Sequence, residues 1–69
     1  MREVTILTGH VSNAYVDILG VYYSVGDAKD DLKVLEVRRK EGCTKPCLIK
    51  TGEVVENYDY FNVETFKVL

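Results

Sequence analysis

One segment of this chain carries the pattern of a helix and lies between runs of strand-forming residues, which limits the folds open to it. In SVGDAKDDLKVLEVRRKEG (24–42), Ser24 suits an N-cap, Asp27 resembles the acidic partner of a capping box, and Gly42 suits a stop. Acidic residues gather at the N-terminal end and basic residues at the C-terminal end, as the helix dipole favours. Apolar residues at helical spacing predict one buried stripe, made of Val25, Ala28, Leu32 and Leu35.

Four stretches outside this segment are typical of β-structure. EVTIL (3–7) predicts a strand. The following TGHVSN predicts a connection, in which Asn13 suits a left-handed conformation. AYVDILGVYY (14–23) predicts a second strand, antiparallel to the first. LIKTGEVV (48–55) indicates either a tight hairpin around Thr51 and Gly52 or an extended loop, and YFNVETFKVL (60–69) a final strand. The order β-β-α-(β-β)-β predicts an α+β fold, with one amphipathic helix packed on an antiparallel sheet of three to five strands.

The second predicted strand is apolar on both sides. Strict alternation places Val16, Ile18 and Tyr22 on one side, and Tyr15, Leu19, Val21 and Tyr23 on the other. In the final strand the alternation leaves open which set of residues meets the helix. Because a single helix covers only one face of a sheet, the sequence predicts that the second face is uncovered.

The length of 69 residues predicts one small domain spanning the whole chain. A composition of 46% hydrophobic and 29% charged residues is that of a folded protein. A chain of this size buries only about 60% of its unfolded surface, so we expect marginal stability. A homodimer is one way in which such a domain gains further burial.

The nine basic and eleven acidic residues give a net charge of −2, with the basic residues concentrated between positions 36 and 50. This asymmetry is far from the large positive field that nucleic-acid binding normally needs. The chain has neither the roughly 18 consecutive apolar residues of a membrane span nor the apolar core of a secretory signal. We therefore expect a cytoplasmic protein that does not associate with membranes.

Cys43 and Cys47 are the two cysteines of the chain, in the stretch EGCTKPCLIK (41–50). Their spacing fits half of a zinc site, but the second pair of ligands is missing. A disulfide would close a very short loop and constrain the unfolded chain little. The helix end before Cys43 opposes a reactive thiolate. We expect two free, partly buried thiols that serve packing.

Little in the sequence favours catalysis. His10 is the single histidine, Ser12 lies close to it in a predicted turn, and no phosphate-binding glycine loop is present. Residues of these types in a turn after a strand are usually polar turn residues. We expect neither enzymatic activity nor a cofactor.

Two sets of residues suit binding to a partner. Tyrosine is enriched at protein interfaces because it buries a large rigid ring and keeps a polar tip. The tyrosines proposed to contact a protein are Tyr15, Tyr22, Tyr23, Tyr58 and Tyr60. The alternative is nucleic acid, with phosphates contacted by Arg38, Arg39, Lys40, Lys45 and Lys50. The acidic pI and the acidic C-terminal segment disfavour this alternative.

The strand VTILTG (4–9), the stretch ILGVYYS (18–24) and the following helix resemble a loose group of small phage and prophage proteins. The resemblance covers somewhat over half of the chain and does not include the cysteine loop. It implies a ββαβ-type fold and a phage accessory role, in which the partner is a host protein of the defence or gene-expression machinery. It implies no catalytic or binding residues.

Overall fold

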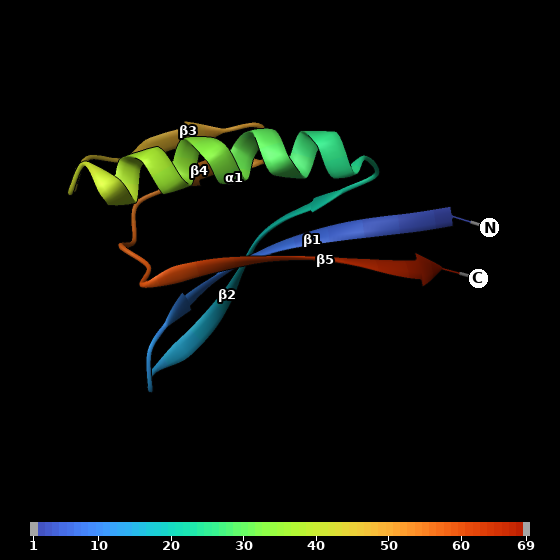
Figure 1. The fold of residues 1–69 in the computed structure, drawn as a ribbon, viewed down its shortest axis with the longest axis horizontal. Helices are drawn as coiled ribbons and strands as arrows, with labels where there is room; N and C mark the ends of the chain where they lie inside the picture. Colours follow the sequence, from blue (N-terminus) through green and yellow to red (C-terminus); the bar gives the residue numbers. More distant parts are fainter. Residues whose placement is uncertain (1, 69) are drawn as a thin grey trace.

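The computed structural model describes residues 2–68 and contains five strands and one helix. In chain order they are β1 (Arg2–Val11), β2 (Tyr15–Tyr22), α1 (Val25–Lys40), β3 (Cys47–Ile49), β4 (Gly52–Val54) and β5 (Tyr60–Val68). An antiparallel sheet has the order β2-β1-β5, and β3 and β4 form a second sheet of two strands. Both α1 and the β3–β4 hairpin lie on one side of the larger sheet (Figure 1). The predicted α+β class is confirmed.

Both predicted turns are displaced in the structure. β1 continues to Val11, beyond the predicted end at residue 7, because residues 8–10 pair with β2 on one side and with β5 on the other. The connection shortens to three residues, where Asn13 adopts the expected left-handed conformation with φ 61°. Residues 47–54 form a hairpin rather than an extended loop. Its turn residues are Lys50 and Thr51, one position earlier than predicted, since Ile49 pairs with Gly52.

A β-bulge in the first hairpin overturns the alternation predicted for the second strand. Leu7 pairs with Gly20 but Thr8 pairs with Ile18, so the register shifts by one residue of β2. A single extra residue moves the side chains that follow to the opposite face. Tyr22 is therefore buried on the helix side, and Ile18 shares the opposite side with Val21.

The buried side of α1 also differs from the predicted apolar stripe. Its buried residues are Ala28, Asp31, Leu35 and Arg38. The predicted Val25 is exposed, and Leu32 is only half-buried. Two charged residues enter the buried side because α1 packs on the β3–β4 hairpin as well as on the sheet, and the hairpin backbone offers them polar partners.

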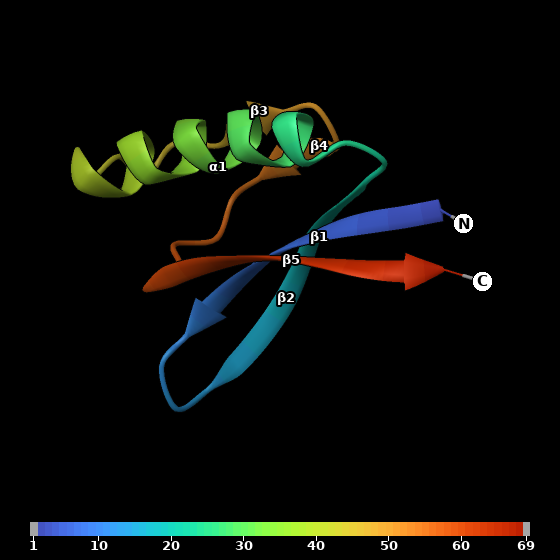
Figure 2. The same cartoon turned by 45° about the vertical axis from the view of Figure 1, so that its right-hand side comes forward.

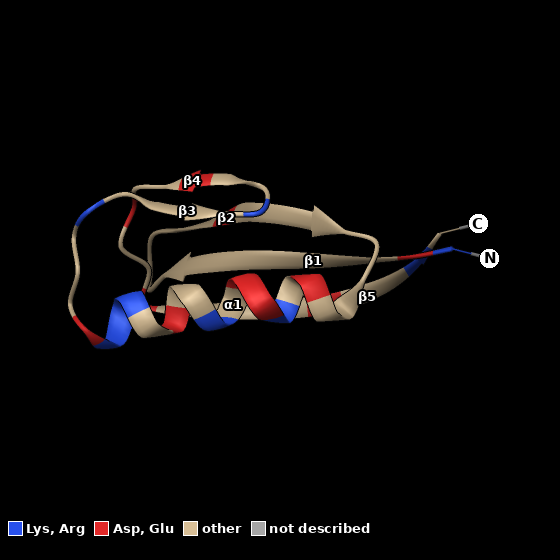
Figure 3. Ribbon diagram, turned by 90° about the horizontal axis from the view of Figure 1, so that it is seen from above, with Lys and Arg blue, Asp and Glu red and all other residues tan. Residues whose placement is uncertain are grey.

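The ends of α1 follow the sequence pattern in part. Ser24 is the N-cap by its extended backbone conformation, but its side chain makes no capping hydrogen bond, so the predicted capping box does not form. Gly42 has φ 67°, a left-handed conformation that glycine adopts without strain, and it ends the helical stretch as predicted. Figure 3 shows acidic residues toward the start of α1 and basic residues toward its end.

Two glycines on the helix side of the sheet make room for two tyrosine rings. A Cβ atom on Gly9 would lie 2.7 Å from the ring of Tyr58, and one on Gly20 would lie 2.6 Å from the hydroxyl of Tyr22. Each distance is shorter than any van der Waals contact, so only glycine fits. The Thr-Gly and Gly-Val-Tyr stretches therefore have a packing role in this fold.

Asp31 and Arg38 attach the β3–β4 hairpin to α1. The Asp31 carboxylate accepts hydrogen bonds from the backbone amide of Lys50 at 3.1 and 3.2 Å, at the hairpin turn. Arg38 donates to the carbonyl oxygens of Lys45, Val55 and Glu56 at 2.9, 3.3 and 3.0 Å, at the open end of the hairpin. Seven helical residues span about 10 Å, which equals the length of a three-residue strand. The two attachments therefore match the two ends of the hairpin.

Candidate interaction face

Among residues 2–68, no helix or strand covers the side of the three-stranded sheet that faces away from α1 (Figure 2). We call this side the open face. The residues that line a shallow hollow on it are Ile6, Thr8, His10, Val16, Ile18, Asn62, Glu64 and Phe66. Val21 belongs to the same side because it lies directly opposite Ile6. The hollow has a volume of about 300 Å³, and all three strands contribute to it.

The exposed apolar residues of the open face are mostly aliphatic. Ile18, on the edge strand β2, is 67% exposed, and Val16 and Val21 on the same strand are each more than half exposed. Phe66 on β5 adds an aromatic ring at the opposite edge of the hollow. Isolated exposed apolar residues are normal on protein surfaces, whereas a set to which three strands contribute makes this face the candidate site of the chain.

A stacked pair of rings occupies one end of this face. His10 on β1 and Tyr60 on β5 lie opposite each other in the sheet, with ring centroids 4.4 Å apart and ring planes inclined by 12°. The Nε2 atom of His10 lies 2.9 Å from the hydroxyl of Thr8. The imidazole is thus held by a neighbouring ring and a hydroxyl and does not engage Ser12, whose backbone amide donates to Asp59 at 2.6 Å.

The charge at the hollow is low. Glu64 is the carboxylate there, and it accepts a hydrogen bond of 2.9 Å from Asn62. None of the residues that line the hollow is a lysine or an arginine. The lining residues therefore do not produce a strong field of positive sign.

The structure separates the five tyrosines proposed as contacts. Tyr22 and Tyr58 are 5% and 7% exposed and lie in the core. Tyr60 is on the open face, Tyr23 is highly exposed beyond the end of β2, and Tyr15 is half exposed at the start of β2. The aliphatic residues of the open face were not proposed as contacts from the sequence. Strand alternation alone places Val16 and Ile18 on one side, but the bulge is needed to add Val21 to them and to remove Tyr22.

The two core tyrosines each donate to a carboxylate. Tyr22 donates to Asp31 and Tyr58 donates to Asp17, each at 2.6 Å. Burial, and secondarily the bond to Asp31, raises the pKa of Tyr22 to about 12. Burial and the bond to Asp17 likewise raise the pKa of Tyr58 above its usual range. Both hydroxyls therefore stay protonated as structural donors at neutral pH.

The basic residues proposed to contact phosphates do not form a free cluster. Arg38 is buried, with its guanidinium bonded to three carbonyl oxygens. Lys50 forms ion pairs of 2.9 and 3.2 Å with Asp27 and Asp30, and these hydrogen bonds raise the pKa of the amine. Arg39 lies 4.0 Å from Glu36. The exposed remainder, Lys40 and Lys45, lies near the C-terminal end of α1 and away from the residues that line the hollow of the open face.

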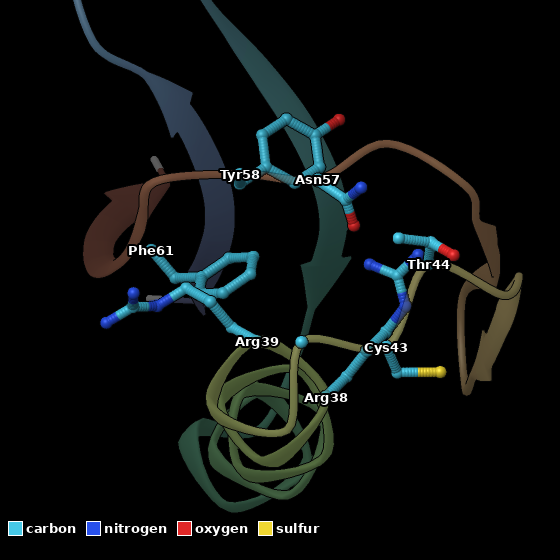
Figure 4. Close-up of a pocket in the computed structure, with 8 residues that line it drawn as sticks. Arg38, Arg39, Cys43, Thr44, Asn57, Tyr58 and Phe61 are labelled. Atoms are coloured by element: carbon cyan, nitrogen blue, oxygen red, sulfur yellow. The ribbon is translucent and has the colours of Figure 1, made fainter.

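A second, smaller hollow of about 190 Å³ lies beside the C-terminal end of α1 (Figure 4). It is lined by Arg38, Arg39, Gly42, Cys43, Thr44, Asn57, Tyr58 and Phe61. In Figure 4 the sulfur of Cys43 points away from the ring of Tyr58. Cys43 and Cys47 are free thiols and half-buried, and Cys47 packs against the core. The cysteine loop therefore contributes packing in this structure.

Among residues 2–68, no group of three or more histidine, cysteine or acidic side chains is placed to hold a metal ion. Within the same range, the helix has neither the length nor the apolar character needed to cross a membrane. Comparison of the chain with protein-family models, with curated proteins and with solved structures gives no match in any of the three.

Proposed function

We propose that this chain is a small, non-enzymatic interaction protein that acts by stoichiometric binding of a protein through its open face. The observation that carries the proposal is the exposed apolar surface to which all three strands contribute and on which Ile18 is the most exposed apolar residue. Burial of such an apolar surface against a complementary partner lowers the free energy, because the apolar side chains are removed from water. The resemblance to phage proteins favours a host protein as the partner, whose own surface would be blocked by the complex.

Protein is favoured over nucleic acid because the hollow of the open face has rings but no cations among its lining residues. Binding to a single strand combines stacking rings with a basic groove that follows the backbone. On the open face, His10, which stacks on Tyr60, lines the hollow together with the carboxylate of Glu64. A phosphate backbone would meet this carboxylate and no lysine or arginine among the lining residues.

Affinity capture from a bacterial lysate, with and without nuclease treatment, tests the proposal, with three tagged proteins compared in parallel. The wild-type chain should retain one protein in near-equimolar amount. Ile18→Glu should lose it, because a carboxylate would be buried without a partner in the interface. The control Val37→Glu should retain it, since Val37 is half exposed on α1, across the sheet from the open face.

Two results would contradict the proposal. Capture by Ile18→Glu at the wild-type level would place the contact elsewhere on the molecule. Captured material that disappears on nuclease treatment, and that depends on Lys40 and Lys45, would instead support the nucleic-acid alternative.

A further inference from the structure

We infer that, when no other partner is bound, the open face is covered by the open face of a second copy of this chain. This inference rests on the proposed function, because it assigns an occupant to the same surface. The hollow on this face is suited to self-association by its low charge, because Glu64 is the one acidic residue among the lining residues and none of them is a lysine or an arginine. Arg2, which lies opposite Val68 on the same side, is at the end of the sheet. Two identical faces can therefore meet without opposing arrays of like charge.

The exposed area of the face is close to what a dimer needs. Its most exposed apolar residues are Val16, Ile18, Val21, Tyr60, Phe66 and Val68. With the polar residues between them they expose on the order of 700 Å², against about 800 Å² per partner in a standard stable interface. The apolar character of these exposed residues is typical of homodimer interfaces, which are more apolar than transient ones.

The overall dimensions of the chain point to the same conclusion. Its radius of gyration is 12.1 Å, whereas about 11 Å is expected for a compact domain of this length. Its accessible surface is 4907 Å², whereas about 4400 Å² is expected for a compact monomer of this size. The single chain therefore exposes more surface than an ordinary monomer. A second copy on the open face would remove this excess.

The core of the single chain is small, which gives the second copy a stabilising role. The buried hydrophobic residues are Leu7, Tyr22, Ala28, Leu35, Ile49, Val54 and Tyr58. Face-to-face packing of two sheets would add an inner layer about 10 Å thick, with each α1 on the outside. In this arrangement Ile18 of one copy has the hollow of the other within reach, because Ile18 is both a lining residue and the most exposed apolar residue of the face.

Sedimentation equilibrium over a concentration series tests the dimer with the purified full chain. The wild type should sediment as a dimer at micromolar concentration, and Ile18→Glu should weaken the dimer by about 100-fold or more, because each copy would bury an unpaired carboxylate. Val37→Glu should remain dimeric. The midpoint of thermal unfolding should rise with protein concentration for the wild type and stay constant for Ile18→Glu. Circular dichroism establishes that each variant is folded.

The outcomes separate this inference from the proposed function. A wild type that is monomeric throughout the series overturns the inference. A dimer that survives Ile18→Glu and dissociates with Val37→Glu also overturns it, because such a dimer would not form through the open face. If the monomeric wild type still captures a protein that Ile18→Glu loses, the proposed function stands without the dimer. If the wild type dimerises through Ile18 and captures no other protein, the inference stands and the host-protein proposal fails.

Discussion

The phenol of Tyr22 on β2 donates a 2.6 Å hydrogen bond to the carboxylate of Asp31 on α1, and both residues are buried. The same carboxylate accepts the backbone amide of Lys50 in the β3–β4 turn. One carboxylate thus joins the main sheet, the helix and the hairpin. Since two uncharged donors satisfy it, no buried counter-ion is needed at this position.

Removing the Tyr22 hydroxyl should therefore destabilise the fold. Tyr22→Phe keeps the ring that packs over Gly20 but deletes a hydrogen bond to a charged group, which should lower the free energy of unfolding by about 1.5–3 kcal/mol. Urea unfolding followed by circular dichroism measures the change. The matched control is Tyr23→Phe, because Tyr23 is 81% exposed and its hydroxyl should matter by less than about 0.5 kcal/mol. Equal stabilities for the two variants would contradict the assigned role.

Stability should fall as the pH rises above 10. Burial raises the pKa of Tyr22 from 10.0 to about 12, so between these values the folded chain keeps a proton that the unfolded chain has lost. The folded state therefore binds more protons than the unfolded state in this range, and the free energy of unfolding falls as the pH rises. The raised pKa of Tyr58 acts in the same direction.

Tyrosinate absorbance and urea unfolding at pH values of about 9 and about 11 measure this dependence. Part of the absorbance change should lag behind that of free tyrosine. Tyr22→Phe should lose part of the pH slope, which separates the tyrosine contribution from that of the lysines. A variant with the full wild-type slope would show that Tyr22 does not titrate as described.

Arg38 should be far more important for folding than its neighbour Arg39. Arg38→Met fills similar volume but leaves three carbonyl oxygens without their charged donor, and it should cost about 3 kcal/mol of unfolding free energy. This is a large part of the total expected for such a small domain. Arg39→Met, at an exposed position paired with Glu36 at 4.0 Å, should change the stability by less than about 0.5 kcal/mol. A small effect at Arg38 would indicate that the hairpin is held by other contacts.

Two glycine substitutions should act in opposite directions. Gly9→Ala places a methyl group 2.7 Å from the Tyr58 ring and should destabilise by about 1–3 kcal/mol through overpacking. Gly26→Ala lies in the first turn of α1, where the nearest atom is 3.5 Å from the added carbon. It should stabilise by about 0.5–1 kcal/mol, because alanine restricts the unfolded chain and favours helix. Thermal unfolding of the two variants beside the wild type measures both effects, and a shift in the same direction would contradict this account.

The sequence by itself determined the class of fold and the position of most elements. The helix begins after Ser24 and ends before Gly42, Asn13 occupies the turn of the first hairpin, and the last strand runs from Tyr60. These features depend on periodicity, end signals and turn conformation, which act over a few neighbouring residues. The uncovered face also followed from the sequence, because one helix covers only one side of a sheet.

Only the tertiary structure decided which residues lie on that face and which charged residues are buried. The bulge between Leu7 and Thr8 is a property of two paired strands, and it moves Tyr22 into the core while Ile18 stays outside. Asp31 and Arg38 resemble ordinary helix-end charges until the hairpin backbone meets them. The physical reason is common to these cases. Burial depends on partners distant in sequence, which local patterns do not contain.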